Sequence, residues 1–236
     1  MYVLYYAYVV RVNRWEVRVR ARFTVSDIAT AALEIVDRDG LSGLSMRSLA
    51  GSLGTGPMTL YNYVRDRGEL EELVAEAVIT EVKVPVKSDN WCSDVRAIAL
   101  AMWETLRRHP NAIPLVLTRR TVSASSYLAA DRLIAALTRA GLDAEDLLAS
   151  FRAVLGLVMG SAQAELAGPL AGPGRDREQV AVAARIGRLA GEEHPHIAAL
   201  SQVSQQSTAA ADFERGLNIL LVGIESLGSG QRPALD

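Results

Sequence analysis

The sequence has one cysteine, three histidines and no long apolar run. The lone Cys92 excludes an internal disulfide and a thiolate zinc site, and His109, His194 and His196 offer little for a histidine-based metal cluster. No stretch reaches about 18 apolar residues, so we expect a cytoplasmic protein with no membrane partner. A Gly-x-Ser-x-Gly elbow, a phosphate-binding loop and a dinucleotide fingerprint are missing, so we predict no catalytic residue, no metal and no cofactor.

What the chain does have is ample apolar material and an uneven distribution of charge. Half of its 236 residues are apolar, which is typical of a globular protein. Residues 1–67 hold nine arginines against six acidic residues, whereas the remainder holds sixteen basic and twenty-one acidic residues. A basic head on an acidic body indicates that only the head meets a polyanion.

Residues 1–23 form an N-terminal extension of unusual composition. Ten mostly apolar or aromatic residues come first, and five arginines follow. This order is the reverse of that in a signal peptide. The extension is interpreted as an arm that reaches DNA, as a disordered tail, or as residues encoded upstream of the true start.

From Thr24 onward, apolar residues repeat at helical spacing between Pro/Gly and polar breaks. Thr24 and Asp27 have the spacing of a capping box. Gly40 can close the first helix, and Ser45 is a good N-cap for the next. The chain is therefore predicted to be all-α, with roughly ten helices, at about 24–40, 46–53, 57–64, 69–82, 94–108, 112–118, 123–140, 143–166, 176–190 and 208–227, and a short one that opens at Pro195.

Residues 45–64 have the pattern of two short helices joined by a turn that contains Gly54. If the second helix buries Leu60 and Val64, its outer side carries Thr59, Asn62 and Tyr63. This is the arrangement of a helix-turn-helix, whose second helix enters the major groove of DNA. Threonine and asparagine can hydrogen-bond to base edges, and tyrosine hydroxyls suit phosphate oxygens.

Three arginines flank this unit and can neutralise phosphates, namely Arg47, Arg65 and Arg67. Two short helices around a glycine turn also occur in many all-α proteins that do not bind DNA. A purely structural role for residues 45–64 therefore stays open at this point. Tyr61 is interpreted mainly as a packing residue.

The order of residues across 24–82 can also be compared with known families. More than a dozen positions follow one pattern without gaps, namely Ile28, Ala31, Ala32, Ile35, Gly40, Leu44, Ser45, Met46, Arg47, Leu49, Ala50, Leu53, Gly54, Thr59, Leu60, Tyr61, Tyr63, Val64, Arg67 and Leu70. This pattern resembles the DNA-binding domain of the tetracycline-repressor family. The resemblance implies DNA contacts by Ser45, Arg47, Thr59, Tyr61, Asn62, Tyr63 and Arg67. The family usually has lysine where Arg67 stands, a change that a phosphate contact tolerates.

The remainder resembles the effector domain of the same family, through residues 106–110, 127–141, 156–160 and 213–225. After the extension at 1–23, the resemblance implies a DNA-binding domain at 24–84 and an effector-binding and dimerisation domain at 88–228. Candidate pocket residues are Trp103, Leu106, Ile113, Leu117, Tyr127, Phe151, Leu155, Met159 and Gln163. Candidate residues of a homodimer interface are Gly156, Gly160, Phe213, Leu217, Leu220, Leu221 and Ile224.

Metal-bound tetracycline is not the expected effector. The founding members of the family hold magnesium–tetracycline through a His, a Thr and a Glu, and the register puts Val116, Arg119 and Gly160 at these positions. A valine cannot ligate a metal, and a glycine has no carboxylate. A small, mainly apolar effector is expected instead.

The resemblance predicts a ligand-responsive repressor that binds double-stranded, pseudo-palindromic operator DNA as a homodimer. Two alternatives stay open. One is a protein that sequesters or modifies a ligand on the same scaffold. The other is a ligand-independent DNA binder or an activator.

Overall fold

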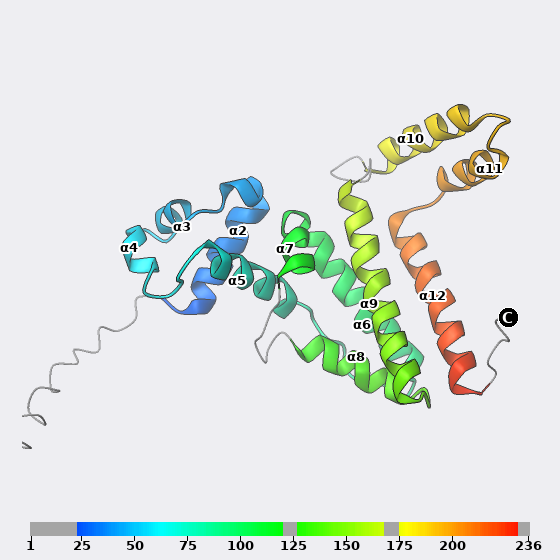
Figure 1. Cartoon of the computed structure of the whole chain (residues 1–236), viewed down its shortest axis with the longest axis horizontal. Coiled ribbons are helices and arrows are strands. Elements are labelled where there is room, and N and C mark those ends of the chain that lie inside the picture. Colours follow the sequence, from blue (N-terminus) through cyan, green and yellow to red (C-terminus); the bar gives the residue numbers. More distant parts are fainter. Residues whose placement is uncertain (1–22, 120–126, 168–174, 231–236) are drawn as a thin grey trace, which may run out of the picture.

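In the computed structural model, the described residues are 23–119, 127–167 and 175–230, and within them the chain is all-α, as predicted. Eleven α-helices and one 3-10 helix follow one another there (Figure 1): α2 (Val25–Gly43), α3 (Met46–Ser52), α4 (Pro57–Leu60), α5 (Arg67–Thr80), α6 (Trp91–Arg108), η1 (Pro110–Ala112), α7 (Ile113–Thr118), α8 (Leu128–Thr138), α9 (Ala144–Ala167), α10 (Arg175–Ala190), α11 (Pro195–Ser204) and α12 (Ala209–Gly228). Apart from Phe23, the N-terminal extension lies outside the described residues, so its role stays a prediction.

Local capping sets the ends of the first helices. The Asp27 N–H donates to Thr24 Oγ1 at 3.1 Å, and the Thr24 N–H donates to the Asp27 carboxylate at 2.8 Å. Gly40 leaves the helical conformation with a φ of 71°, which glycine adopts more readily than other residues. The Ser48 N–H donates to the Ser45 hydroxyl at 3.0 Å and so starts α3. These are the capping signals that the sequence predicts.

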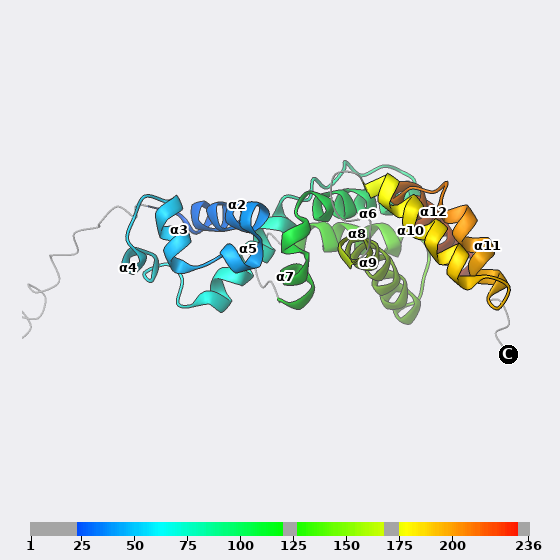
Figure 2. The same cartoon turned by 90° about the horizontal axis from the view of Figure 1, so that it is seen from above.

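Helices α2 to α5 form a head at one end of the elongated molecule (Figures 1 and 2). Each of them contributes fully buried side chains to the core, including Ile28, Leu49, Leu60 and Leu70. Fully burying a side chain of this size typically stabilises the fold by about 1.5–3 kcal/mol. Helix α3 packs against α2 and α4, and α2 packs against α5, so the buried side chains of the two short helices join one core.

The body is a helical bundle in which α6 packs against α8 and α9, and α9 packs against α12. The Trp103 ring of α6 stacks on Phe213 of α12 with 4.5 Å between centroids and an interplanar angle of 3°. The Arg107 guanidinium carbon lies 4.5 Å from the centroid of the Trp103 ring. This aromatic cluster joins α6 to α12 inside one chain.

Two features of the body leave apolar surface uncovered. By length and composition alone, residues 144–164 of α9 are long and apolar enough to cross a membrane. The count of uninterrupted apolar residues in the sequence does not identify this stretch. Only 22% of this stretch is buried, although Val154 and Val158 lie fully in the core. Helices α10 and α11 pack mainly on each other and project beyond the end of α9 and α12 (Figure 1).

Candidate DNA-binding and effector sites

The turn between α3 and α4 positions α4 on the outside of the head. Gly54 has a φ of 59° there, and the Thr55 N–H donates to the Ala50 carbonyl at 2.9 Å. Leu60 and Val64 are buried at 0% and 1% exposure, as the helix-turn-helix pattern predicts. The opposite side of α4 is therefore free to meet a large partner.

The side chains that lie on this outer side differ from the predicted set. Asn62 is exposed and Thr59 is half-buried. Tyr61 is 49% exposed, so its interpretation as a packing residue is wrong, and Met58, which the sequence analysis missed, is 77% exposed. Tyr63 instead packs against Phe23, whose N–H donates to the Tyr63 hydroxyl at 3.4 Å. The α-helix ends at Leu60, so regular helical spacing does not apply to the residues after it.

The predicted phosphate contacts also differ in their surroundings. Arg47 is exposed and has no ion pair with any described residue. Arg67 is already engaged, because its Nε donates to Glu71 at 2.8 Å and its Nη2 to the Leu41 carbonyl at 3.0 Å. The Ser45 hydroxyl caps α3. The DNA contacts of Arg67 and Ser45 stay predictions. Within the chain, Arg67 binds Glu71 and Leu41, and Ser45 caps α3.

An apolar cavity of about 200 Å³ lies between α5 and the body helices α6 to α9. Its lining residues are Val78, Ile79, Val82, Met102, Thr105, Leu106, Val116, Tyr127, Ala129, Ala130, Leu155 and Met159. The Thr105 hydroxyl already donates to the Ala101 carbonyl at 2.8 Å. Such walls favour a ligand that gains most of its binding energy from apolar burial.

The predicted pocket residues divide into two groups. Four line this cavity together, namely Leu106, Tyr127, Leu155 and Met159. Five do not line it, namely Trp103 and Ile113, which are buried in the core, Phe151, which packs against the core, and Leu117 and Gln163, which are exposed. The predicted pocket residues include none from α5, although the apolar spacing continues to the end of that helix.

A polar cluster beside the cavity joins the head to the body. The His109 ring, at the end of α6, has Nδ1 2.8 Å from Asp37 of α2 and Nε2 2.9 Å from Glu81 after α5. Each ring nitrogen thus lies at hydrogen-bond distance from one carboxylate, and the two carboxylates belong to different helical segments. Asn111 adds a hydrogen bond to the Asp37 carbonyl at 3.0 Å. The end of α6 is thereby tied to both α2 and α5.

Glu71 forms a second link at the same junction. Its carboxylate accepts hydrogen bonds from Arg67 at the start of α5 and from Arg119 after α7. Burial raises the pKa of the Glu71 carboxyl, but the hydrogen bonds and charges of the two arginines outweigh burial and hold the pKa below its ordinary value. Glu71 is therefore ionised at neutral pH and holds α7 against α5.

The predicted dimer residues lie on two different faces. Phe213, Leu217, Leu221 and Ile224 are at most 4% exposed because they pack inside their own chain, so they are unavailable to a partner and their assignment is corrected. Periodicity does not show which of two apolar faces of α12 turns inward.

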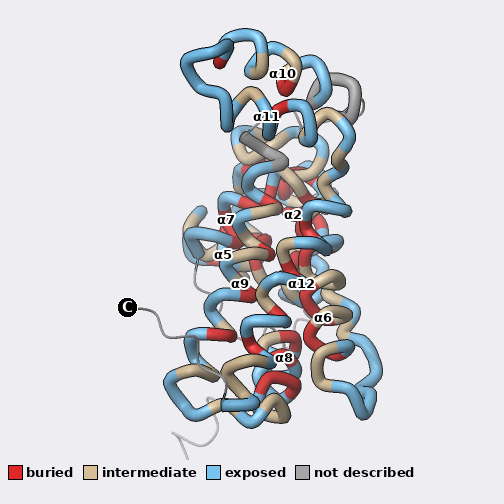
Figure 3. Tube along the Cα trace, turned by 90° about the vertical axis from the view of Figure 1, so that its right-hand side faces the viewer, coloured by how far each residue is buried: buried red, intermediate tan, exposed pale blue. Residues whose placement is uncertain are grey.

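Gly156 and Gly160 are exposed on α9, and Leu220 is half-buried on α12. The outward side chains of α12 are Ile219 and Val222, which are 69% and 60% exposed. Figure 3 shows these exposed stretches along α9 and α12. The two helices therefore present an uncovered face that is apolar and contains small residues.

In the part of the chain that the structure describes, no group of three or more His, Cys, Asp or Glu side chains is placed to hold a metal ion. Val116 lines the cavity, whereas Arg119 is paired with Glu71. The expectation of a metal-free effector stays a prediction.

A helix-turn-helix head joined to a larger helical body with an apolar cavity is the architecture of a helix-turn-helix transcriptional regulator. Residues 84–227 match the family model described as the tetracyclin repressor-like, C-terminal domain. The chain belongs to the tetracycline-repressor family.

Named relatives agree with this assignment. The chain is 30% identical over 221 residues to the HTH-type transcriptional repressor DrrR1 of Streptomyces coeruleorubidus, with 89% of this chain and 80% of DrrR1 covered. It is 36% identical over 149 residues to an HTH-type transcriptional regulator of Saccharopolyspora erythraea, a match that spans 63% of each protein. The structure of apo ActR from Streptomyces coelicolor has a TM-score of 0.75 at 24% identity, covering 89% of this chain and 99% of ActR. ActR in complex with actinorhodin has a TM-score of 0.75 at 26% identity, covering 86% and 96%.

Proposed function

We propose that this protein is a transcriptional repressor that binds a pseudo-palindromic operator as a homodimer and releases it when a small, mainly apolar effector enters the α5–α9 cavity. The observation that carries the proposal is the double role of α5. Val78 and Ile79 of this helix, with Val82 just after it, form one wall of the cavity. The helix is tied to the junction by Glu71 near its start and by Glu81 after its end. A relative named as a repressor and a related structure with a bound small molecule support the same function.

The head supplies the DNA contact. Asn62 and Thr59 carry hydrogen-bonding groups suited to base edges, and the exposed Met58 offers an apolar contact for a thymine methyl group. Arg47, which forms no ion pair within the described ranges, is suited to a phosphate. In a dimer the two copies of α4 have to lie about 34–36 Å apart to enter successive major grooves.

The effector acts by moving α5. A ligand that expands the cavity pushes on the Val78–Val82 wall, and His109 and Glu71 transmit the displacement to α2 and to the start of α5. The separation of the two recognition helices then changes. The extent of release is set by how much more tightly the ligand binds the released conformation than the DNA-bound one.

The homodimer forms through the exposed faces of α9 and α12. Gly156 and Gly160 have no side chains, so a partner helix can approach α9 closely, and Ile219 and Val222 supply apolar area on α12. A second copy on this face accounts for the exposed length of α9. In this proposal the apolar composition of α9 serves assembly.

Fluorescence anisotropy with labelled DNA from upstream of the gene tests the function. We expect sequence-specific binding that candidate polycyclic compounds reverse equally well with and without excess EDTA. An Ala130→Trp variant, which fills the cavity, should bind DNA normally and resist release. The matched Ala135→Trp variant, whose site lies outside this cavity, should respond like the wild type.

Each alternative predicts a different result. DNA binding that no compound reverses indicates a ligand-independent binder or an activator. Compound binding without specific DNA binding indicates a ligand-sequestering or ligand-modifying protein. Release that vanishes on chelation and returns with magnesium contradicts a metal-free effector.

A further inference from the structure

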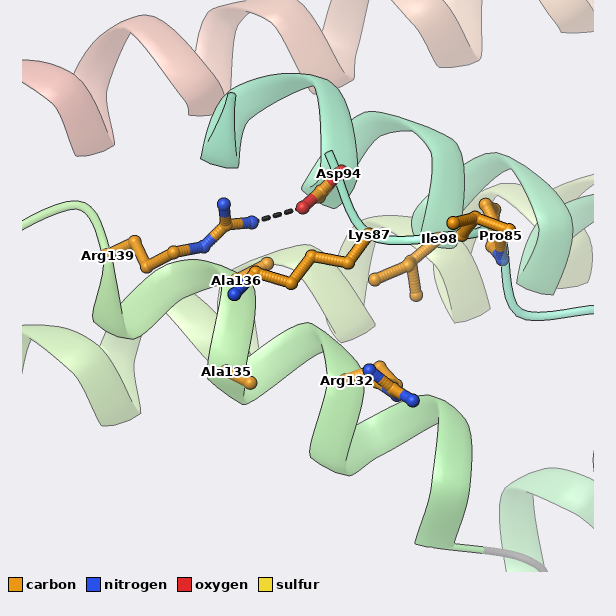
Figure 4. Close-up of a pocket in the computed structure, with 9 residues that line it drawn as sticks. Pro85, Lys87, Asp94, Ile98, Arg132, Ala135, Ala136 and Arg139 are labelled. Atoms are coloured by element: carbon orange, nitrogen blue, oxygen red, sulfur yellow. Dashed lines mark hydrogen bonds and ion pairs between the residues drawn. The ribbon is translucent and has the colours of Figure 1, made fainter. Parts of the chain in front are cut away.

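A second cavity, of about 150 Å³, lies further along the α6–α8 pair, towards the start of α6 and the end of α8 (Figure 4). It is closed on one side by the segment of residues 85–87 that follows α5. No residue lines both this cavity and the α5–α9 cavity. The two are therefore separate sites.

The second cavity is rich in positive charge. Lys87, Arg132 and Arg139 all line it, and Asp94 is the only acidic residue among its lining residues. Figure 4 shows Lys87 extended from its segment towards α8, which contains Arg132 and is followed directly by Arg139. No ion pair with a described residue involves Lys87 or Arg132. Two of the three positive charges thus have no counter-ion in the described part of the chain.

Asp94 carries one negative charge and is paired with Arg139, so it does not balance the charges of Lys87 and Arg132. Oδ1 accepts hydrogen bonds from the Ser88 N–H at 2.9 Å and the Ser88 hydroxyl at 2.7 Å, and Oδ2 accepts one from Arg139. These hydrogen bonds, led by that from the Ser88 hydroxyl, hold the pKa of Asp94 below its ordinary value despite burial. The Asp94–Arg139 pair is a fixed part of the wall.

The Nε–H of Arg139 has no acceptor in the described part of the chain. Its Nη1 donates to the Ser88 carbonyl at 2.8 Å and its Nη2 to Asp94, whereas its Nε is buried without a hydrogen-bond partner among the described residues. A buried donor without an acceptor is costly and calls for an explanation. This atom is covered by the protein itself, so it belongs to the wall and does not face a ligand in the cavity.

The other walls are apolar. Ile98 and Ala136 are 4% and 3% exposed, and Val86 at the rim is 94% exposed. We propose that this cavity binds a small organic anion, a carboxylate on a short apolar chain. Lys87 and Arg132 hold the carboxylate, and the chain covers Ile98 and Val86. This proposal does not depend on the DNA-binding function.

The test is an NMR titration of [1-¹³C]hexanoate with the full-length protein. We expect saturable binding and competition by unlabelled hexanoate. Hexan-1-ol has the same chain without the charge and should compete at least about tenfold more weakly, because hydrogen bonds to charged groups are strong. Hexanol that competes equally well, or hexanoate that does not saturate, overturns the proposal.

Variants separate this site from the α5–α9 cavity. Lys87→Gln with Arg132→Gln should weaken hexanoate binding at least about tenfold. Lys83→Gln with Arg188→Gln removes the same charge from exposed positions outside the cavity and should leave binding unchanged. Ala135→Trp should block binding, whereas Ala130→Trp should not. Hexanoate binding that survives Lys87→Gln with Arg132→Gln, or that Ala130→Trp abolishes, assigns the anion to another site and overturns the proposal.

Discussion

At Glu71, one carboxylate serves two arginines from distant parts of the chain. Arg67 also holds the Leu41 carbonyl at the end of α2, while Arg119 follows α7. The Glu71 side chain is 12% exposed, so water compensates little for a lost partner. This residue therefore connects the stability of the head to that of the effector domain.

Replacing Glu71 by glutamine should lower the free energy of unfolding near neutral pH by about 1–3 kcal/mol, because two charged partners lose a buried acceptor. The pKa of Glu71 in the folded state lies below its ordinary value of 4.5. Its contribution is therefore present above about pH 4.5 and is lost as the pH falls through the folded-state pKa. Urea unfolding at several pH values should show the wild type approaching Glu71→Gln in acid.

Glu72 provides a matched control for this prediction. It is the exposed neighbour of Glu71. Its replacement by glutamine should change stability by no more than about 0.5 kcal/mol. A gap between wild type and Glu71→Gln that stays constant from neutral to acid pH would show that the charge of Glu71 is not the cause.

At the scale of elements, α4 is a single turn whose outer surface combines polar and apolar groups. Asn62 and Thr59 are suited to reading bases, whereas Arg47 on α3 is suited to phosphate. The two kinds of contact respond differently to DNA sequence and to salt, so they can be told apart.

Asn62→Ala should weaken operator binding by about 1–3 kcal/mol and narrow the difference between operator and random DNA. Arg47→Ala should weaken binding to both DNAs alike and reduce the slope of log affinity against log salt by about 1. Anisotropy titrations over a range of salt concentrations measure both effects. Equal losses on operator and random DNA for Asn62→Ala would exclude base reading by this residue.

Local chemistry explains which elements the sequence predicts well. The caps at Thr24 and Ser45 and the positive φ at Gly40 depend on neighbouring residues alone, so helix ends could be predicted. The roles of Tyr61 and Tyr63 could not, because they depend on where the one-turn α4 stops and on the contact with Phe23. Short helices are fixed by tertiary packing more than by their own pattern.

The sites were harder to predict because they are assembled from helices distant in sequence. Trp103 and Met102 are adjacent apolar residues of α6, yet Trp103 stacks on Phe213 and Met102 lines the cavity. In α12, Leu217 and Ile219 look alike in sequence, but one is buried and the other is 69% exposed. Apolar periodicity identifies faces and does not tell a core face from a ligand or partner face.

At the scale of the whole molecule, the head, the junction and the bundle are arranged along one axis, and α9 and α12 lie away from the head (Figure 1). Exposed apolar patches that are contiguous mark interaction sites in proteins. A repressor that spans two half-sites needs two heads. Binding to the full operator therefore depends on the surface through which the two copies assemble.

The double variant Ile219→Arg with Val222→Arg should convert a dimer of about twice 25.4 kDa into a monomer while leaving the helical content unchanged. Both side chains point outward in the single chain, so the arginines stay solvated there, but in the dimer four positive charges would be buried without partners. Val86→Arg places a charge on another exposed valine, outside α9 and α12, and should keep the dimer mass. Light scattering at micromolar concentration and operator titration measure the two consequences. A double variant that keeps the dimer mass would place the interface elsewhere, and a monomer that binds the full operator as tightly as the wild type would separate DNA binding from assembly.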